Sequence, residues 1–375
     1  MAIDPLRTKI CDLVGCEFPI FAFTHCKDVA AAVSNAGGVG VLGELGRTPD
    51  EIVEDIAWLR ERVGDKPFGI DLVFPASIPA STMNMEDLEA QIPQEHREFV
   101  SDLMTRHDIP AATQPPAGGP MSGMVGMLSQ ENARKQLDAA IETNVPIIAS
   151  GLGSPAFAVE AAHARGIKLM GLIGRVRQAQ REVDAGVDMI VAQGYDAGGH
   201  TGEIGTFTLL PRVTAIAGDT PVLCAGGVGT GQHLAAALCL GASGVWCGSL
   251  WLASRESDMA FKVKEKLMEA TEEDTIRSRA LTGKPARQLK TDFNLAWEEP
   301  GAPEPLTMPL QGLLIRDLQL AVREQQAQDF MGTPLGQVVG QITEMRPCAE
   351  ILFDMVEGAR DTFDHWLVDP VADPA

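Results

Sequence analysis

Short apolar segments recur along the chain, each followed by a turn and then by an Ala-rich segment of helical period. Successive segments begin 20, 29, 78, 22, 21, 32 and 23 residues apart, and every interval except the third suits one strand plus a crossover helix. Eight parallel strands before residue 250 favour a (β/α)8 TIM barrel over the competing architecture, a doubly wound open sheet. The predicted strands are PIFAF (19–23), VGVL (39–42), FGIDLV (68–73), PIIA (146–149), KLMGL (168–172), MIVAQ (189–193), PVLCA (221–225) and GVWC (244–247).

One crossover helix carries recognisable end signals. Ser154 followed by Pro155 is typical of an N-cap with proline in the first helical position, and Gly166 is a typical stop. The segment SPAFAVEAAHARG is therefore predicted to form one helix.

The third interval holds roughly fifty residues more than a crossover needs. It contains polar helical stretches and then IPAATQPPAGGPMSGMVGML, residues 109–128. This excursion is either loosely packed or a lid that lines the substrate site, and we expect the lid because long loops over a barrel mouth usually line the site. The predicted divisions are a first part of the barrel (1–75), a helical insertion or lid (76–135), a second part of the barrel with a phosphate site (136–260), and a C-terminal helical region packing on both (261–375).

The charge and cysteine content exclude several classes of function. A net charge of −21, from 30 Lys and Arg against 51 Asp and Glu, argues against nucleic acid and anionic membrane partners. The N-terminus lacks signal-peptide features and no apolar run reaches membrane-spanning length, so we expect a cytoplasmic protein with a small-molecule substrate. Seven scattered cysteines without a Cys-x-x-Cys pair, and histidines without ligand spacing, predict neither a disulfide framework nor a metal site.

Glycine-rich turns follow the last two predicted strands. AGGVGTGQHLAAAL (225–238) and GSLWLAS (248–254) each place small residues before a helix. Bare backbone amides at two adjacent helix N-termini favour a phosphate, although tight packing of strand against helix would select the same residues. We expect a phosphate site here, with His233 on the solvent face of the following helix.

AQGYDAGGHTG (192–202) places His200 behind two glycines after the sixth predicted strand. The position puts His200 at the barrel mouth, beside the expected phosphate. It is either a loop histidine bonded to backbone or an acid/base group brought close to a ligand by the glycines, and the two readings stay open on these residues alone.

These segments resemble the FMN-dependent nitronate monooxygenases, formerly called 2-nitropropane dioxygenases. The similarity extends to VSNAGGVGVLG, TGKPARQL and GQVVGQITEMRPCAEIL. It implies a flavoprotein with an FMN-binding TIM barrel, and it is less specific for the reaction because relatives include enoyl-thioester reductases and NADH:quinone reductases. It also implies that His200 takes the α-proton of a nitroalkane or orients a nitronate. The implied cofactor-binding residues are Gln193 beside the isoalloxazine, Gly198 and Gly199 close to the flavin, and Ala225, Gly226, Gly227, Gly248 and Ser249 at the phosphate.

Two departures from the family pattern concern the flavin site. AFTHCKD replaces the usual Pro-Met or Gly-Met turn after the first strand, so we expect Ala22, Phe23 and Thr24 to line the flavin, with His25 a surface or capping histidine and Cys26 a packing residue. Asp71 stands where the family usually has Asn. A carboxylate there would repel the reduced flavin unless it were protonated or paired, and the alternative that we favour is a plain acceptor for the flavin N–H edge or ribityl hydroxyls.

Three functions follow from these observations. The first is an FMN-dependent oxidoreductase that oxidises alkyl nitronates with O2, and the alternative enzyme is an NAD(P)H-dependent FMN reductase of an enoyl-thioester or quinone. The third is a flavin- or phosphate-binding barrel without catalytic activity, which the histidine at the mouth argues against. Self-association into a homo-oligomer stays open.

Overall fold

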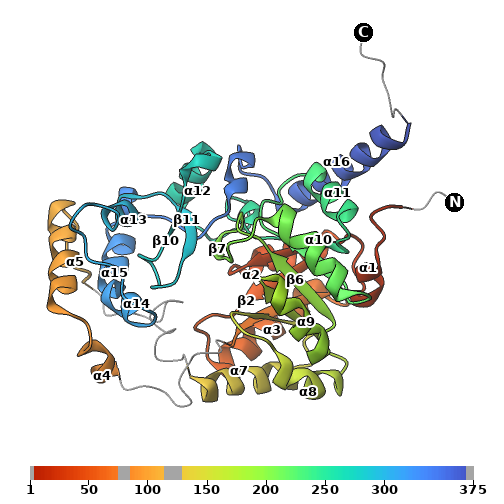
Figure 1. Ribbon diagram of the computed structural model, residues 1–375, viewed down its shortest axis with the longest axis horizontal. Helices are drawn as coiled ribbons and strands as arrows, with labels where there is room; N and C mark the ends of the chain where they lie inside the picture. Colours follow the sequence, from red (N-terminus) through yellow and green to blue (C-terminus); the bar gives the residue numbers. More distant parts are fainter. Residues whose placement is uncertain (1–3, 75–84, 114–128, 369–375) are drawn as a thin grey trace, which may run out of the picture.

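The computed structural model describes residues 4–74, 85–113 and 129–368, and its centre is a closed parallel barrel (Figure 1). The strand order is β1-β2-β3-β4-β5-β6-β8-β9, and the pairing of β1 with β9 closes the ring. Every predicted barrel strand is present, so the TIM barrel is confirmed and the open sheet is wrong. The strands are β1 (Ile20–Thr24), β2 (Val39–Gly43), β3 (Phe68–Val73), β4 (Ile147–Gly151), β5 (Lys168–Ile173), β6 (Met189–Gln193), β8 (Val222–Ala225) and β9 (Gly244–Cys247).

Amphipathic helices surround the strands. The helix Pro49–Val63 shows why they form: Thr48 and Glu51 make a capping box, and Ile52, Ile56 and Leu59 recur at helical spacing and are buried. The helices around the barrel are α2 (Lys27–Asn35), α3 (Pro49–Val63), α7 (Gln130–Glu142), α8 (Val159–His163), α9 (Val176–Ala185), α10 (Thr206–Ala217) and α11 (Gly231–Cys239).

The barrel interior is a packed core. Alternate residues of each strand point inward, and their side chains form one apolar cluster that includes Val41, Ala149, Met170 and Trp246. The short helix α1 (Lys9–Val14) adds Ile10 and Cys11 to the same cluster. Apolar side chains therefore fill the interior of the barrel, which leaves the carboxyl ends of the strands as the place for a ligand.

The predicted helix over 154–166 is wrong in its first half. The Ser154 hydroxyl does not cap a helix; it donates a 3.0 Å hydrogen bond to a carboxylate oxygen of Glu182 in α9. A 3₁₀ turn, η1 (Ala156–Ala158), precedes α8, and Gly166 does follow the helix with a φ of 74°. A tertiary acceptor thus competes successfully with the local capping interaction.

A second, mostly helical lobe lies beside the barrel (Figure 1). Its core joins the predicted insertion to the chain after residue 261, because Val100 and Leu103 pack with Phe293, Ile315 and Leu318. Its helices are α4 (Met85–Glu89), α5 (Gln94–Arg106), α13 (Asp292–Ala296), α14 (Leu310–Leu314) and α15 (Arg316–Glu324).

The described residues include only part of the predicted lid. Most of its Pro/Gly/Met-rich part, residues 114–128, lies outside the described residues, so the lid and the four-part division of the chain stay predictions. The last helix, α16 (Cys348–Val368), returns to the barrel and packs against α11 and α2. No helix in the described ranges is long and apolar enough to cross a membrane.

A small antiparallel sheet, which the sequence did not predict, joins the barrel to the chain that follows it. Its order is β10 (Thr275–Ser278), β11 (Ala286–Leu289) and β7 (Gly199–His200). Ala286 pairs with His200 and Arg287 with Gly199. The hairpin β10–β11 therefore fixes the strand that carries the predicted catalytic histidine.

Candidate active site

His200 is held by its backbone and by one ring nitrogen. Its Nδ1 lies 3.2 Å from the carbonyl oxygen of Pro285. Because a carbonyl oxygen only accepts, Nδ1 carries the hydrogen of this bond and Nε2 is the unprotonated nitrogen of the neutral ring. Surrounding protein atoms desolvate the half-exposed ring and lower the pKa of His200. A neutral imidazole with Nε2 available is a competent base.

Two arginines of the hairpin hold the turn on both sides of His200. Arg287, which is only 4% exposed, donates to the carbonyl oxygen of Tyr195 from Nε and Nη2 and to the hydroxyl of Thr275 from Nη1. Arg277 donates from Nη2 to the carbonyl oxygen of Thr201, at 3.2 Å. The guanidinium carbons lie 4.6 Å (Arg287) and 5.3 Å (Arg277) from the centre of the Tyr195 ring.

Sequence reasoning missed both arginines as parts of the site. TGKPARQL was used only as a family resemblance, although it contains Arg287. The available signal was the spacing of Arg277 and Arg287 around a short glycine turn, which is typical of a hairpin. Their partners on the histidine turn are more than seventy residues away in the chain and carry no local signal.

The turns after β8 and β9 meet at the mouth. Gly226 and Gly227 have φ angles of 97° and 72°, a region that L side chains rarely adopt, so glycine is required for this backbone path. A Cβ on Gly229 would lie 3.2 Å from a methyl group of Leu250, which shows that the two turns are adjacent. The predicted phosphate residues Ala225, Gly226, Gly227, Gly248 and Ser249 therefore lie on neighbouring strand ends and turns.

A hydrogen bond from another segment of the chain holds the Ser249 side chain. Its Oγ accepts a 2.8 Å hydrogen bond from the backbone N–H of Gly336, so the hydroxyl hydrogen is free to point toward a ligand. Gly336 also lies against the histidine turn, because a Cβ there would sit 2.8 Å from the carbonyl oxygen of Asp196. The segment around Gly336 thus connects the phosphate turn to the histidine turn. Its sequence, GQVVGQ, entered the analysis only as part of the family resemblance, with no role assigned to it.

His233 differs from its prediction. The ring is half-buried rather than on the solvent face, and Nδ1 accepts a 3.2 Å hydrogen bond from the backbone N–H of Gly229. Thr230 caps α11 by accepting from the His233 backbone N–H. Burial lowers the pKa of His233, which keeps Nδ1 available as an acceptor. The helical periodicity was correct, but a side chain near a helix start can fold back over the preceding turn.

Four side chains in the upper barrel form the floor of the mouth. The Phe23 ring stacks on Trp246 with centroids 5.7 Å apart, and Gln193 donates from Nε2 to the carbonyl oxygen of Gly198. Asp71 is 7% exposed, and its Oδ1 has no hydrogen-bond partner among the described residues. Burial raises the pKa of Asp71 to about 7.

The residues next to Phe23 in the sequence have different environments. Ala22 is fully buried in the outer core between barrel and helices, so only its backbone is available to a ligand in the mouth. The Thr24 hydroxyl accepts from the backbone N–H of Cys26 at 3.0 Å. His25 is exposed at the rim with Nδ1 3.0 Å from the carbonyl oxygen of Gly43, and Cys26 is buried, in keeping with the surface and packing interpretations.

This arrangement fits a flavin. Glycine turns and a serine hydroxyl at two adjacent strand ends can hold a phosphate, while an aromatic ring, an amide and a buried carboxyl with a free oxygen lie at the bottom of the same mouth. The described residues contain no group of three or more His, Cys, Asp or Glu side chains placed to hold a metal ion.

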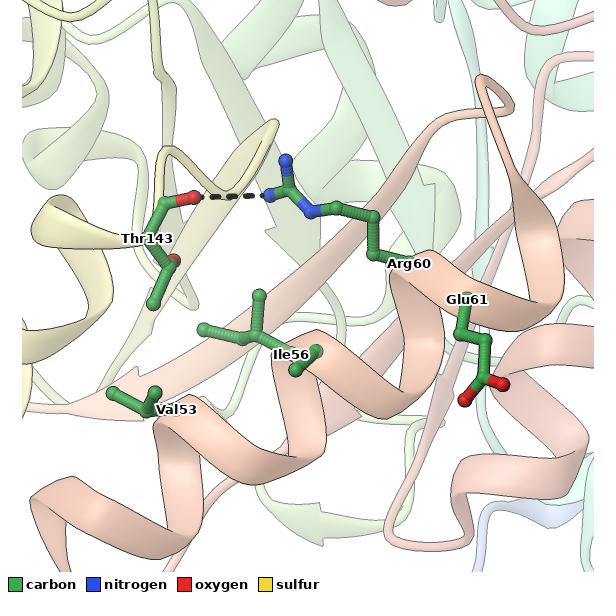
Figure 2. A pocket seen from close by; sticks show the side chains of 6 residues that line it. Val53, Ile56, Arg60, Glu61 and Thr143 are labelled. Atoms are coloured by element: carbon green, nitrogen blue, oxygen red, sulfur yellow. Dashed lines mark hydrogen bonds between the residues drawn. The ribbon is translucent and has the colours of Figure 1, made fainter.

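A groove of about 530 Å³ lies elsewhere, on the flank of the barrel between α3 and α7 (Figure 2). Val53, Ile56 and Ala57 form its apolar side, and Arg60 donates to the carbonyl oxygen of Thr143 across it. The groove is formed by outer helices, so it is separate from the mouth that contains His200.

Comparisons with known proteins identify relatives of this chain. The family model described as nitronate monooxygenase matches residues 7–358. A Mycobacterium tuberculosis protein named as a candidate monooxygenase is 43% identical, over 95% of this chain and 97% of its own length. A Staphylococcus saprophyticus protein named as a probable nitronate monooxygenase is 30% identical, over 77% of this chain and 80% of its own.

Two solved structures share the fold. FabK from Thermotoga maritima superposes with a TM-score of 0.73 and 28% identity, covering 96% of this chain and 98% of that one. A nitroalkane oxidase from Streptomyces ansochromogenes superposes with a TM-score of 0.77 and 24% identity, covering 94% and 98%. The second identity supports a common fold only. With the family model extending over nearly the whole described chain, the protein belongs to the nitronate monooxygenase family of flavin-dependent oxidoreductases.

Proposed function

We propose that the protein is an FMN-dependent nitronate monooxygenase that oxidises alkyl nitronates with O2, using His200 as base or substrate-orienting group. The observation that supports this proposal is the His200 ring, because its Nδ1 bond to the Pro285 carbonyl oxygen makes Nε2 the unprotonated nitrogen. Desolvation lowers the pKa of the ring and so keeps it neutral near pH 7.

The cofactor assignment is supported by the two glycine turns. In this proposal Ala225, Gly226 and Gly227 after β8 and Gly248 and Ser249 after β9 hold the FMN phosphate. Gly198 and Gly199 would let the histidine turn approach the ring system, and Gln193, Asp71, Phe23 and the backbone around Ala22 and Thr24 would line it. Bound FMN supplies an electron acceptor.

His200 acts differently on the two forms of substrate. With a neutral nitroalkane, Nε2 takes the α-proton, the C–H bond breaks, and the electron pair stays on the substrate as the nitronate. With a nitronate already formed, no α-proton needs to leave the substrate. His200 then orients the anion in its protonated form, because an Nε2–H can donate to an anionic oxygen whereas a bare Nε2 cannot. The arginines keep the turn in place in both cases, because they bind the carbonyl oxygens of Tyr195 and Thr201.

The test uses the purified protein in an anaerobic cuvette. We expect a visible flavin band that identifies as FMN after release, and bleaching of that band by an alkyl nitronate without a nicotinamide. Bleaching only by NADH or NADPH would assign the protein to the reductases of an enoyl-thioester or quinone. A protein without flavin that takes up no FMN would contradict the cofactor assignment.

The remaining expectations about partners are independent of this test. A cytoplasmic location, a small-molecule substrate without nucleic acid or membrane partners, and an open oligomeric state stay predictions from the sequence.

A further inference from the structure

Asp71 occupies an unusual place in the barrel. It lies on β3 level with Gly43 of β2 and Ala149 of β4, on the inward-facing side of the strands. Among the inward-facing positions of β1 to β9, it is the one carboxyl in the described barrel. Its neighbours on both sides are small, and its side chain is 7% exposed.

No cation among the described residues compensates this carboxyl, since no charged group contributes to its pKa shift. The neighbouring strands, VGVLG and IIASG, carry no charged side chain. Glu44 follows β2, but its carboxyl is influenced by Lys27, Arg47, Asp55 and Glu51 behind the barrel wall rather than by the mouth. Among the described residues, the backbone amide of Gly151 is the one group that lowers the pKa of the Asp71 carboxyl against the effect of burial.

The hydrogen bonding of the Asp71 carboxyl bears on its protonation state. Oδ1 of Asp71 is buried without a hydrogen-bond partner among the described residues. An ionised carboxylate in this position would have one oxygen unsatisfied and no counter-charge, which is unfavourable in a desolvated site. A neutral carboxyl would instead carry an O–H on Oδ1 and would need an acceptor in the mouth.

We propose that Asp71 binds the flavin as a neutral acid, donating the Oδ1 hydrogen to a carbonyl or ring-nitrogen acceptor of the isoalloxazine, so that loss of this proton weakens cofactor binding. The proposal rests on the proposed function, because it requires a flavin in this mouth. It differs from the plain-acceptor interpretation of the sequence, since the hydrogen is donated by the protein. Asp71 then presents the same donor that an asparagine would supply.

The test measures FMN affinity of the apoprotein by quenching of flavin fluorescence from about pH 5 to about pH 9. We compare the wild type with Asp71→Asn, which keeps a donor without a titrating proton, and with Glu44→Gln. Glu44 is the matched control because it is equally buried, has a pKa raised by burial to about 8, and lies at the end of the neighbouring strand facing away from the mouth.

The expected result is a difference in slope. The wild-type Kd rises about tenfold per pH unit once Asp71 ionises, Asp71→Asn stays flat relative to it, and Glu44→Gln follows the wild type. The FMN phosphate titrates equally in all three proteins and cancels in the comparison. Equal slopes for wild type and Asp71→Asn, or wild-type binding that tightens relative to Asp71→Asn as pH rises, would overturn the proposal.

A second measurement keeps the proposal testable if Asp71→Asn folds poorly. Infrared difference spectra of the wild type and Glu44→Gln, with and without FMN at about pH 6, report the protonated-carboxyl band. We expect FMN to shift this band in both proteins, and an unshifted band would contradict the proposal. Failure of the wild type to bind FMN at any pH is a separate outcome, because it overturns the cofactor assignment and this inference with it.

Discussion

The guanidinium of Arg287 donates two hydrogen bonds to the carbonyl oxygen of Tyr195, from Nε at 3.3 Å and from Nη2 at 3.2 Å. Arg287 belongs to β11 and Tyr195 begins the turn that ends at His200, so the contact ties the C-terminal half of the chain to the barrel mouth. Because Arg287 is almost fully buried, this contact stabilises the fold as well as holding the histidine turn in position.

Replacing Arg287 by lysine should move the histidine turn without removing any group that touches substrate. Lysine cannot make the planar two-donor contact, and it leaves the Thr275 hydroxyl without its donor. We expect the free energy of unfolding to fall by about 1–3 kcal/mol and kcat to fall more than KM changes. The pKa values in the pH profile should stay in place, since His200 itself is unchanged.

The control for this substitution is Arg106→Lys. Arg106 pairs with Glu299 at 3.2 Å, and both side chains are about half exposed, so its loss should cost at most about 1 kcal/mol. Equal decreases in the free energy of unfolding and in kcat for the two variants would show that the paired hydrogen bonds of Arg287 contribute nothing specific to the histidine turn.

His200→Asn should separate proton abstraction from substrate orientation. We expect kcat/KM for a neutral nitroalkane to fall about 10²–10⁴-fold, because the base is lost, and the rate with preformed nitronate to fall much less. In the wild type, the lowered pKa of His200 means that the neutral, active ring persists to a pH below the ordinary histidine value, and activity on the nitroalkane is lost only under more acidic conditions.

Steady-state kinetics with both substrate forms, over a pH series, checks this prediction. The FMN content of the variant, read from its visible spectrum, must match that of the wild type. A loss of the same size with nitroalkane and nitronate would rule out His200 as the base.

Gly248→Ala tests the phosphate turn. A Cβ on Gly248 would meet only Phe23, at 3.8 Å, so the protein itself accommodates the methyl group. We expect apoprotein stability to change by no more than about 0.5 kcal/mol, while FMN affinity falls about tenfold or more because the methyl group obstructs the ligand. Gly312→Ala, in α14, also adds a methyl with nothing within 4 Å and should leave the Kd unchanged. An unaltered Kd in Gly248→Ala would place the phosphate elsewhere.

Glu44→Gln should reveal a buried acid through the pH dependence of stability. Neither carboxylate oxygen of Glu44 has a hydrogen-bond partner among the described residues, and burial raises its pKa to about 8. The folded state therefore holds the proton more tightly than the unfolded state. This contribution is complete below the unfolded pKa of about 4.3 and is lost as pH rises through about 8.

Urea unfolding of wild type and Glu44→Gln at several pH values measures the difference. The wild type should lose stability relative to the variant between about pH 4 and about pH 8, and the difference should then level off. Glu131→Gln, on the exposed face of α7, serves as the control for replacing a glutamate. A difference that does not vary with pH would show that Glu44 is solvated or paired in solution.

The sequence by itself determined the barrel and the location of its mouth. Each strand is a short run of branched and apolar residues with a turn on either side, and these signals act between residues a few positions apart. Gly226 and Gly227 are likewise required by the local backbone, because the turn has positive φ angles that residues with a side chain rarely adopt. Parallel strand order then places these turns and His200 at one end of the barrel.

Only the tertiary structure decided how the mouth is held together. Ser154 bonds to Glu182 instead of capping a helix, His233 folds onto Gly229, and Arg287 reaches a carbonyl oxygen 92 residues away. Such partners are chosen by packing across the fold, where a buried donor must find an acceptor whatever its distance in sequence. The sequence predicted which chemistry the mouth could carry, whereas the contacts that orient His200 and leave Oδ1 of Asp71 unpaired exist only once the chain has folded.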